Sequence, residues 1–168
     1  MGFRGFLIAA LFASAAWAQP PEQAMLAVQT AAGGRVEFQV EIADTPGRRQ
    51  QGLMSRRALA GNAGMLFIFG EVGPVSMWMK GTLLSLDVLF IDDDGRIVRI
   101  APETSPESTA LIPSGKPVRA VLEINAGVCR RLGIRVGDQI DRGALRAWWP
   151  APSAPQTRYR SPSAIAAP

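Results

Sequence analysis

The chain has 168 residues, enough for one domain with a hydrophobic core and too few to expect two. It has no histidine and one cysteine, Cys129, which excludes Ser-His-Asp and Cys-His catalysis and removes the usual zinc, copper and haem ligands, so we expect no metal and no cofactor. Its 18 basic and 14 acidic residues are too nearly balanced for a nucleic-acid surface.

The first residues have the pattern of a secretory signal. Arg4 supplies an early positive charge, an apolar run covers residues 6–17, and Ala16-Trp17-Ala18 is a small-x-small cleavage site before Gln19. The run is shorter than the ~20 residues that a spanning helix needs, and no cysteine near the cleavage point could carry a lipid. We expect a signal peptide over residues 1–18 and an exported protein, periplasmic or extracellular, with no stable membrane anchor.

Two strands and a helix are predicted next. Residues 25–30 can form a strand, and residues 35–42 alternate apolar with polar side chains, which is typical of an antiparallel strand with one wet face. Thr45 and Pro46 have the residue types of a helix cap and first helical position. The helix is predicted to run to about Met54. Three residues would then share one of its faces: Arg49, Leu53 and Arg56.

The middle of the chain predicts a buried sheet. Residues 64–69 are apolar on both faces, as in an interior strand, and residues 70–74 are predicted to turn. Residues 86–91 form another strand, with Asp87 on the same face as Leu89 and Ile91. Asp94-Gly95 predicts a hairpin into residues 96–100. The three aspartates at 92–94 could suggest calcium, but no spaced Glu closes such a site.

The stretch Ser76-Met77-Trp78-Met79-Lys80-Gly81-Thr82 precedes that strand. Alternation places Trp78 and Lys80 on one side and the two methionines on the other. Lys80 and Asp87 stand in the most apolar part of the sequence, where an unpaired buried charge costs several kcal/mol, roughly. We therefore expect Asp87 to pair with a cation: Lys80, Arg49 or Arg56.

The last third predicts a loop, a strand, a helix and a strand. Residues 101–117 are polar and proline-rich, and residues 118–124 form a strand with Glu123 on the face of Val121 and Arg119. Asn125 is the expected cap of a helix through Leu132, and residues 139–145 form the last strand. The whole is predicted to be mainly β, one antiparallel sandwich or barrel-like domain over residues 19–146 with two short helices. Residues 147–168 form a disordered tail.

Several runs resemble the domain-of-unknown-function 192 family. They are Arg49-Gln50-Gln51-Gly52-Leu53-Met54, Arg56, Gly64-Met65-Leu66-Phe67, Trp78-Met79-Lys80, Thr82, Leu86-Asp87, Phe90-Ile91, Leu122-Glu123, Gly133-Ile134 and Gly137-Asp138. The resemblance implies a mostly β sandwich or barrel with short helices. The family occurs in exported bacterial proteins and in archaea, and the resemblance supplies no mechanism. The family usually has Asn where this chain has Gly81, and an aromatic residue where it has Met77.

Three functions fit these residues. The first is a non-catalytic cell-envelope module, expected to be a monomer, that binds a small polar or anionic ligand through charge, a flat aromatic surface and orienting carboxylates. The second is an enzyme: a paired-carboxylate hydrolase of an envelope substrate using Asp87 and Glu123, or a site where Lys80 activates Thr82. In the third, the charges are only a buried salt-bridge network. No catalytic residue is assigned, and the candidate site is Arg49, Arg56, Trp78, Lys80, Thr82, Asp87 and Glu123.

Overall fold

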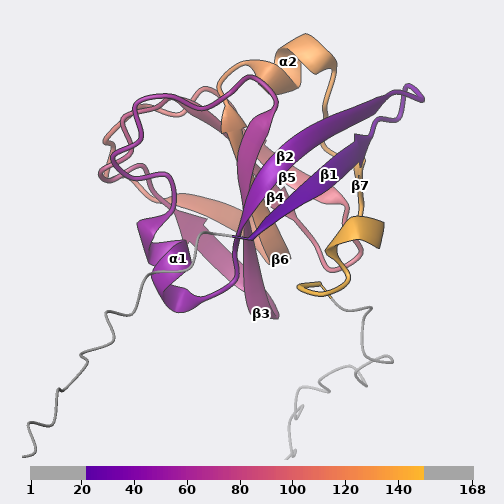
Figure 1. The fold of residues 1–168 in the computed structure, drawn as a ribbon, viewed down its shortest axis with the longest axis horizontal. Helices are drawn as coiled ribbons and strands as arrows, with labels where there is room; N and C mark the ends of the chain where they lie inside the picture. The colour runs from indigo at the N-terminus through magenta and orange to yellow at the C-terminus, as the bar shows by residue number, and fades with distance from the viewer. Residues whose placement is uncertain (1–21, 150–168) are drawn as a thin grey trace, which may run out of the picture.

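The computed structural model describes residues 22–149, which form one curled sheet with two short α-helices beside it (Figure 1). The predicted signal peptide lies outside the described residues. In this part of the chain the strand order is β5-β4-β6-β3-β2-β1-β7. The strands are β1 (Gln23–Gln29), β2 (Arg35–Ala43), β3 (Ala63–Met77), β4 (Leu86–Ile91), β5 (Ile97–Ala101), β6 (Ile112–Asn125) and β7 (Gln139–Asp141).

The mainly β prediction is confirmed, with one departure in strand direction. Alternation in β2 leaves Phe38 and Val40 buried while Glu37 and Gln39 are exposed, and β1 pairs antiparallel with this strand. The next pair, β2 and β3, runs parallel. A parallel pair needs a crossover, and here α1 and the segment after it return the chain to the same end of the sheet.

The sheet closes on itself at one end. The edge strands β5 and β7 are joined through Arg96 opposite Gln139, and the Ile97 amide donates to the Asp138 carbonyl at 2.9 Å. The Ile140 amide donates to the Gly95 carbonyl at 2.8 Å. The result is a half-barrel whose two edges share backbone hydrogen bonds, so these edges are partly protected from pairing with other chains.

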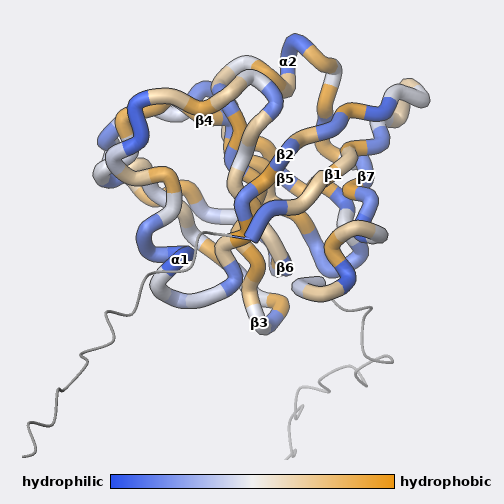
Figure 2. The backbone as a smooth tube through the Cα atoms, in the orientation of Figure 1, coloured by the Kyte–Doolittle hydropathy of each residue, from blue (hydrophilic) through white to orange (hydrophobic). Residues whose placement is uncertain are grey.

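Two apolar clusters lie on the two faces of this sheet. The inner cluster takes side chains from every strand, including Phe38, Leu89 and Ile140. The outer cluster takes side chains from β2, β3, β4 and β6, and Leu53, just after α1, packs into it. The strands are accordingly the most hydrophobic part of the backbone tube, and polar residues concentrate in the helices and turns (Figure 2).

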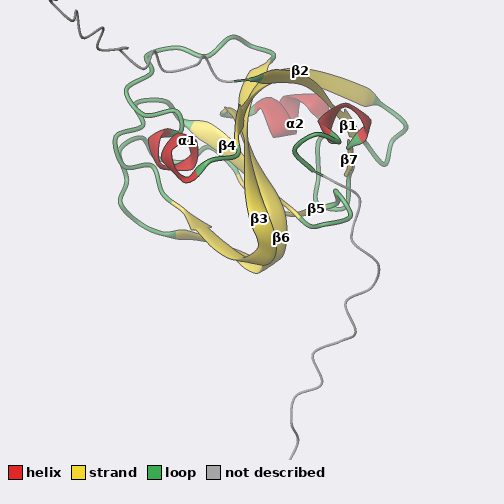
Figure 3. Ribbon diagram, turned by 60° about the horizontal axis from the view of Figure 1, so that its bottom comes forward, coloured by secondary structure: helices red, strands yellow, loops and turns green. Residues whose placement is uncertain are grey.

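The two longest strands were only partly predicted. β3 continues through the predicted turn at 70–74, and β6 begins at Ile112, inside the predicted loop at 101–117. They pair along their extra length with register shifts, as two long neighbouring strands (Figure 3). The Val75 amide donates to Ser114 Oγ at 3.1 Å. The glycines and prolines in both segments are typical of turns. The segments nevertheless pair as strands, because β-bulges absorb the irregular register and the Ser114 hydroxyl accepts a hydrogen bond in place of a backbone carbonyl.

The helices are shorter than predicted. α1 (Pro46–Gln51) begins as expected, with Thr45 Oγ1 accepting from the Arg48 amide at 3.3 Å, but it ends at Gln51, with Gly52 as its C-cap, instead of at Met54. α2 (Val128–Leu132) is capped by Gly127, because the Asn125 side chain instead donates to the carbonyls of Leu59 and Ala60. Neither helix in residues 22–149 has the length and hydrophobicity to cross a membrane.

The C-terminal boundary expected at Arg146 needs correction. The predicted last strand is the short β7, followed by a 3-10 turn at Gly143–Leu145. Trp149 is only 1% exposed and belongs to the inner cluster, and Trp148 Nε1 donates to Glu22 Oε2 at 2.7 Å. The tail was predicted from its composition, but two large aromatic rings bury enough apolar surface to dock. The predicted tail beyond Trp149 lies outside the described residues.

Two truncations measure this docking. Ending the chain after Arg146 removes the buried Trp149 ring and should lower the free energy of unfolding by roughly 3–5 kcal/mol, the usual cost of losing a buried Trp side chain. Ending it after Trp149 keeps both tryptophans and should leave stability unchanged. Urea unfolding of the two proteins provides the comparison, and equal midpoints would show that the docked ring contributes nothing.

Candidate functional site

Within residues 22–149, Asp87 does not pair with a cation. Its Oδ1 accepts from the amides of Glu103 at 2.9 Å and Gly127 at 3.0 Å, and its Oδ2 accepts from the amide of Cys129 at 2.8 Å. The side chain is fully buried. The expected pairing with Lys80, Arg49 or Arg56 is therefore wrong. Three backbone N–H groups satisfy the carboxylate instead, and Asp87 joins β4 to α2 and to the loop after β5.

Asp87 and Glu123 lie on opposite faces of the sheet. In the β4–β6 register Val88 faces Glu123 and Asp87 faces Ile124, so the two carboxylates point to different sides. Glu123 shares its face with Val121 of the outer cluster, as predicted, and Asp87 shares its face with Leu89 of the inner one. This arrangement contradicts the paired-carboxylate hydrolase, because no substrate can lie between these two groups.

Arg56 lies apart from Arg49. Because α1 ends at Gln51, the chain leaves the helix before Arg56, whose guanidinium forms a bidentate pair with Glu41 of β2. Arg49 remains on the helix, where its Nη1 donates to the carbonyl oxygens of Asp44 and Ile68. Its guanidinium also stacks 5.5 Å from the centroid of the Phe69 ring. The predicted common face of the two arginines is therefore lost.

Trp78 and Lys80 are both exposed, and Lys80 Nζ lies 5.4 Å from the centroid of the Trp78 ring. Thr82 is buried, and no hydrogen bond joins it to Lys80 among the described residues. The geometry does not support activation of Thr82 by Lys80. With Asp87 satisfied by amides and Arg56 by Glu41, the five charged candidates also do not form the salt-bridge network of the third hypothesis.

Four of the seven candidates line one pocket, which we call the α1 pocket: Arg49, Trp78, Thr82 and Glu123. It has a volume of about 210 Å³ and lies between the outer face of the sheet and residues 49–54, which all line it. The buried residues Leu53, Phe67 and Thr82 line it together with more exposed ones such as Gln50 and Ser76. α1 lies beside the sheet on the side away from β7 (Figures 1 and 3).

Glu123 is the unusual group of this pocket. It is 4% exposed, it lines the pocket, and no described residue donates a hydrogen bond to its carboxyl group. Burial away from water raises the pKa of Glu123 to about 8. Its backbone position is tightly held, because a Cβ at Gly64 would lie only 2.7 Å from the Glu123 carbonyl oxygen. At neutral pH the carboxyl group is therefore mostly protonated and can both donate and accept a hydrogen bond.

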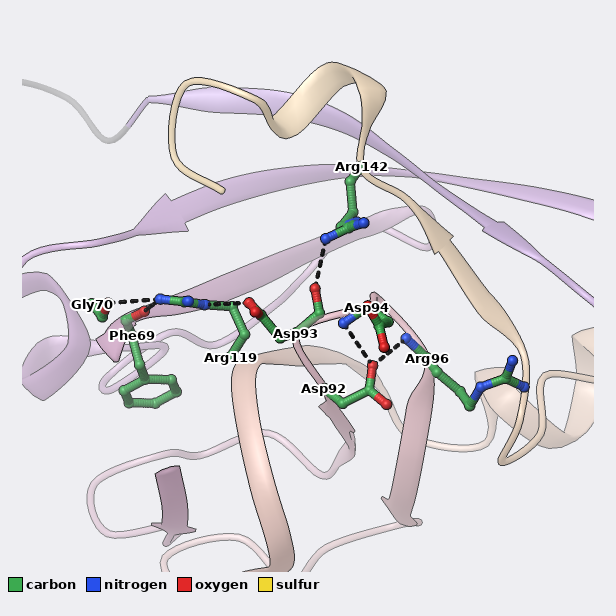
Figure 4. Close-up of polar contacts among 8 residues, drawn as sticks. All are labelled: Phe69, Gly70, Asp92, Asp93, Asp94, Arg96, Arg119 and Arg142. Atoms are coloured by element: carbon green, nitrogen blue, oxygen red, sulfur yellow. Dashed lines mark hydrogen bonds and ion pairs between the residues drawn. The ribbon is translucent and has the colours of Figure 1, made fainter. Parts of the chain in front are cut away.

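The aspartates at 92–94 have structural roles (Figure 4). Asp92 Oδ1 accepts from the amides of Asp94 and Arg96, which closes the β4–β5 turn. Asp93 pairs with Arg119 Nε at 2.8 Å, and its carbonyl accepts from Arg142 Nη1. Within residues 22–149 no three acidic or cysteine side chains gather in a way that could hold a metal ion. The run of aspartates thus ties a hairpin to β6 and to the segment after β7.

The family comparison agrees with the earlier resemblance. The model of DUF192, described as "Uncharacterized ACR", matches residues 27–142. The chain belongs to the DUF192 family. A comparison with curated proteins finds no match. The residues that line the pocket include several that carry the family resemblance: 49–54, Phe67, Trp78, Thr82 and Glu123.

Two solved structures resemble this DUF192 protein. One, from Sinorhizobium meliloti 1021, is described as a candidate transcription regulator. Its sequence is 46% identical to this chain, and the two structures superpose with a TM-score of 0.73. The match covers 74% of this chain and 97% of that one. The other, a protein of unknown function from Novosphingobium aromaticivorans DSM 12444, is 34% identical, with a TM-score of 0.69, over 71% of this chain and 84% of that one.

The DUF192 pattern also explains Gly81. Its φ of +70° is left-handed, a conformation that glycine adopts freely and asparagine adopts more readily than most residues. The usual family Asn therefore fits the backbone at this position. Other pocket residues, such as Met54 and Phe69, were not singled out from the sequence, because an apolar residue on a predicted helix or strand has the pattern of a core residue.

Proposed function

We propose that this DUF192 protein is an exported, non-catalytic binding protein for a small polar or anionic molecule held in the α1 pocket. The observation that supports this most directly is Glu123, a buried carboxyl group that lines the pocket and accepts no hydrogen bond from the described residues. Among the described residues the Glu123 oxygens are not fully enclosed atoms, so they reach the pocket, where a ligand can supply a hydrogen bond.

The composition of the pocket supports binding of a small ligand. Ligand sites combine apolar and aromatic walls with a few polar groups that orient the ligand. Here Phe67, Phe69 and Trp78 provide aromatic surface, and Thr82 and Glu123 provide polar groups. The volume of about 210 Å³ is below the ~300 Å³ at which drug-sized sites begin, so the ligand is a small molecule.

Non-catalytic binding is favoured over catalysis by the charges in the pocket. Of its lining residues only Arg49 and Glu123 carry ionisable side chains. Acid–base chemistry of the paired-carboxylate type needs a second carboxyl group across the substrate. The other carboxylate considered, Asp87, is on the opposite face and satisfied by three amides.

A thermal-shift screen of the mature protein against small envelope sugars, peptides and organic anions tests this proposal. A ligand that binds only the native state, at 100 times its Kd, should stabilise it by about 2.7 kcal/mol. Ser76→Trp places a large ring in the pocket and should abolish the shift. The matched control Ser105→Trp lies outside the pocket and should retain it. A screen with no hit at millimolar concentration, or an equal shift in both variants, contradicts the proposal.

Export is part of the same proposal and is tested separately. The small-x-small pattern at residues 16–18 supports cleavage before Gln19. Intact-mass measurement of the protein recovered from the periplasm or medium should give a chain beginning at Gln19. Recovery of the uncleaved chain in the membrane fraction would contradict it.

A further inference from the structure

Resting on the proposed function, we infer that the α1 pocket binds a small monocarboxylate with an apolar body, and that the ligand binds together with the proton on Glu123. Arg49 supplies the positive charge, Glu123 donates a hydrogen bond, and the aromatic side chains contact the apolar body.

Arg49 has N–H groups that make no hydrogen bond to the described residues. Its Nη1 donates to two backbone carbonyls, which hold the guanidinium at the pocket wall, while Nε and Nη2 have no acceptor among the described residues. The neighbouring carboxylate, Asp44, pairs with Arg48 at 3.2 Å and not with Arg49. The charge of Arg49 is therefore not neutralised by any side chain in the part of the chain that the structure describes. An oriented guanidinium with free N–H groups is suited to a carboxylate ligand.

Burial is the cause of the raised pKa of Glu123, and no charged group among the described residues contributes to it. Its strand neighbours Met65 on β3 and Val88 on β4 are uncharged, and so is Thr82 in the pocket. Burial keeps the proton on its carboxyl group, whose pKa is about 8, so at neutral pH the group donates a hydrogen bond. With a neutral Glu123 and a cationic Arg49 the pocket carries one positive charge, which attracts a carboxylate and disfavours an amine.

The rest of the pocket suits the body of such a ligand. Phe67 and Phe69 come from β3, Met77 ends that strand, and Trp78, 46% exposed, follows it. Aromatic rings and a thioether contact an apolar or aromatic group without any need for further hydrogen bonds. The limited volume fits one ring or a short branched chain more readily than a sugar polymer or a peptide.

Three probes that share one ring test the ligand class by calorimetry: benzoate, benzyl alcohol and benzylamine. Benzoate should bind most tightly at pH 6.5. Its affinity should be nearly constant below pH 7 and should fall about tenfold per pH unit well above 8, as expected when one bound proton is required. Benzyl alcohol should bind at least tenfold more weakly, and benzylamine should show no binding at pH 6.5.

Two charge variants complete the test. Glu123→Gln donates through its amide but cannot titrate, so its affinity for benzoate should be the same at pH 6.5 and pH 9. Arg130→Gln removes an exposed arginine of α2, outside the pocket, and should keep the wild-type pH profile.

Benzylamine binding that tightens above pH 8 would overturn the carboxylate assignment and leave the pocket itself supported. A pH-independent affinity of wild type for benzoate would overturn the proton coupling. If none of the three probes binds while another class in the wider screen does, the ligand class is wrong. If nothing in that screen binds, the proposed function fails as well.

Discussion

Glu123→Gln is expected to stabilise the fold, by an amount that grows as the pH rises. Burial raises the pKa of Glu123 from an ordinary 4.5 to about 8. Below pH 4.5 the group is protonated in both folded and unfolded chains, so its titration makes no contribution to the pH dependence of stability. Between pH 4.5 and 8 the unfolded chain releases the proton and the folded one keeps it. Wild-type stability therefore falls through this window by up to roughly 1.4 kcal/mol per pH unit.

Glutamine has nearly the same shape and carries no charge, so the variant should lack this fall. Urea unfolding at pH 4.5, 6 and 8 measures the difference between variant and wild type, which should be near zero at the lowest pH and reach several kcal/mol at the highest, an order-of-magnitude figure. Glu71→Gln, at an exposed position on β3, should differ from wild type by no more than ~0.5 kcal/mol throughout. If the difference in free energy of unfolding between Glu123→Gln and wild type is the same at all three pH values, the wild-type carboxyl group is not the buried, unpartnered group described above.

A destabilising group in a pocket bears on the proposed function. A buried carboxyl group without a partner reduces stability, and a neutral residue of the same size would be more favourable for folding alone. Function commonly retains such residues at a cost in stability. The two experiments therefore examine Glu123 independently. Urea unfolding compares its protonation in the folded and unfolded chains, and calorimetry measures its effect on the affinity for the ligand.

Asp87→Ala should destabilise the protein by about 3 kcal/mol or more. The change leaves the amides of Glu103, Gly127 and Cys129 without their acceptor, and a buried donor left unsatisfied costs ~1–3 kcal/mol. Asp87→Asn should cost less, because its oxygen can still accept from Glu103 and Gly127. Its amide nitrogen, however, would face the Cys129 N–H, which is also a donor.

Urea unfolding measures both changes, and hydrogen exchange locates them. Protection should fall first at the amides of Gly127 and Cys129, where α2 begins. Asp94→Ala, at an exposed position of the β4–β5 turn, is the matched control and should change stability by no more than ~0.5 kcal/mol. If Asp87→Ala unfolds at the same urea concentration as this control, the three amides do not depend on Asp87.

Local patterns in the sequence determined most of the elements and several faces. Alternation in residues 35–42 predicted β2, because side chains on a strand alternate between two environments. The apolar residues of 86–91 predicted β4, which is buried on both faces. Thr45 and Pro46 predicted the start of α1, because a helix cap involves only residues within one turn of each other in the chain. The face shared by Glu123 and Val121 followed from the same periodicity. The family resemblance, too, rests on residues in order along the chain.

Only the tertiary structure decided what each charge contacts. The carboxylate of Asp87 accepts hydrogen bonds from amides that are 16 to 42 residues away in the chain. No local sequence pattern shows whether a buried carboxylate is paired with amides or with a cation. The end of β3 and the start of β6 were decided by their pairing with each other, and the burial of Trp149 by the space inside the half-barrel. The α1 pocket likewise needs α1, β3 and β6 together. Long-range packing sets the partners and burial of a side chain, and these cannot be read from neighbours in sequence.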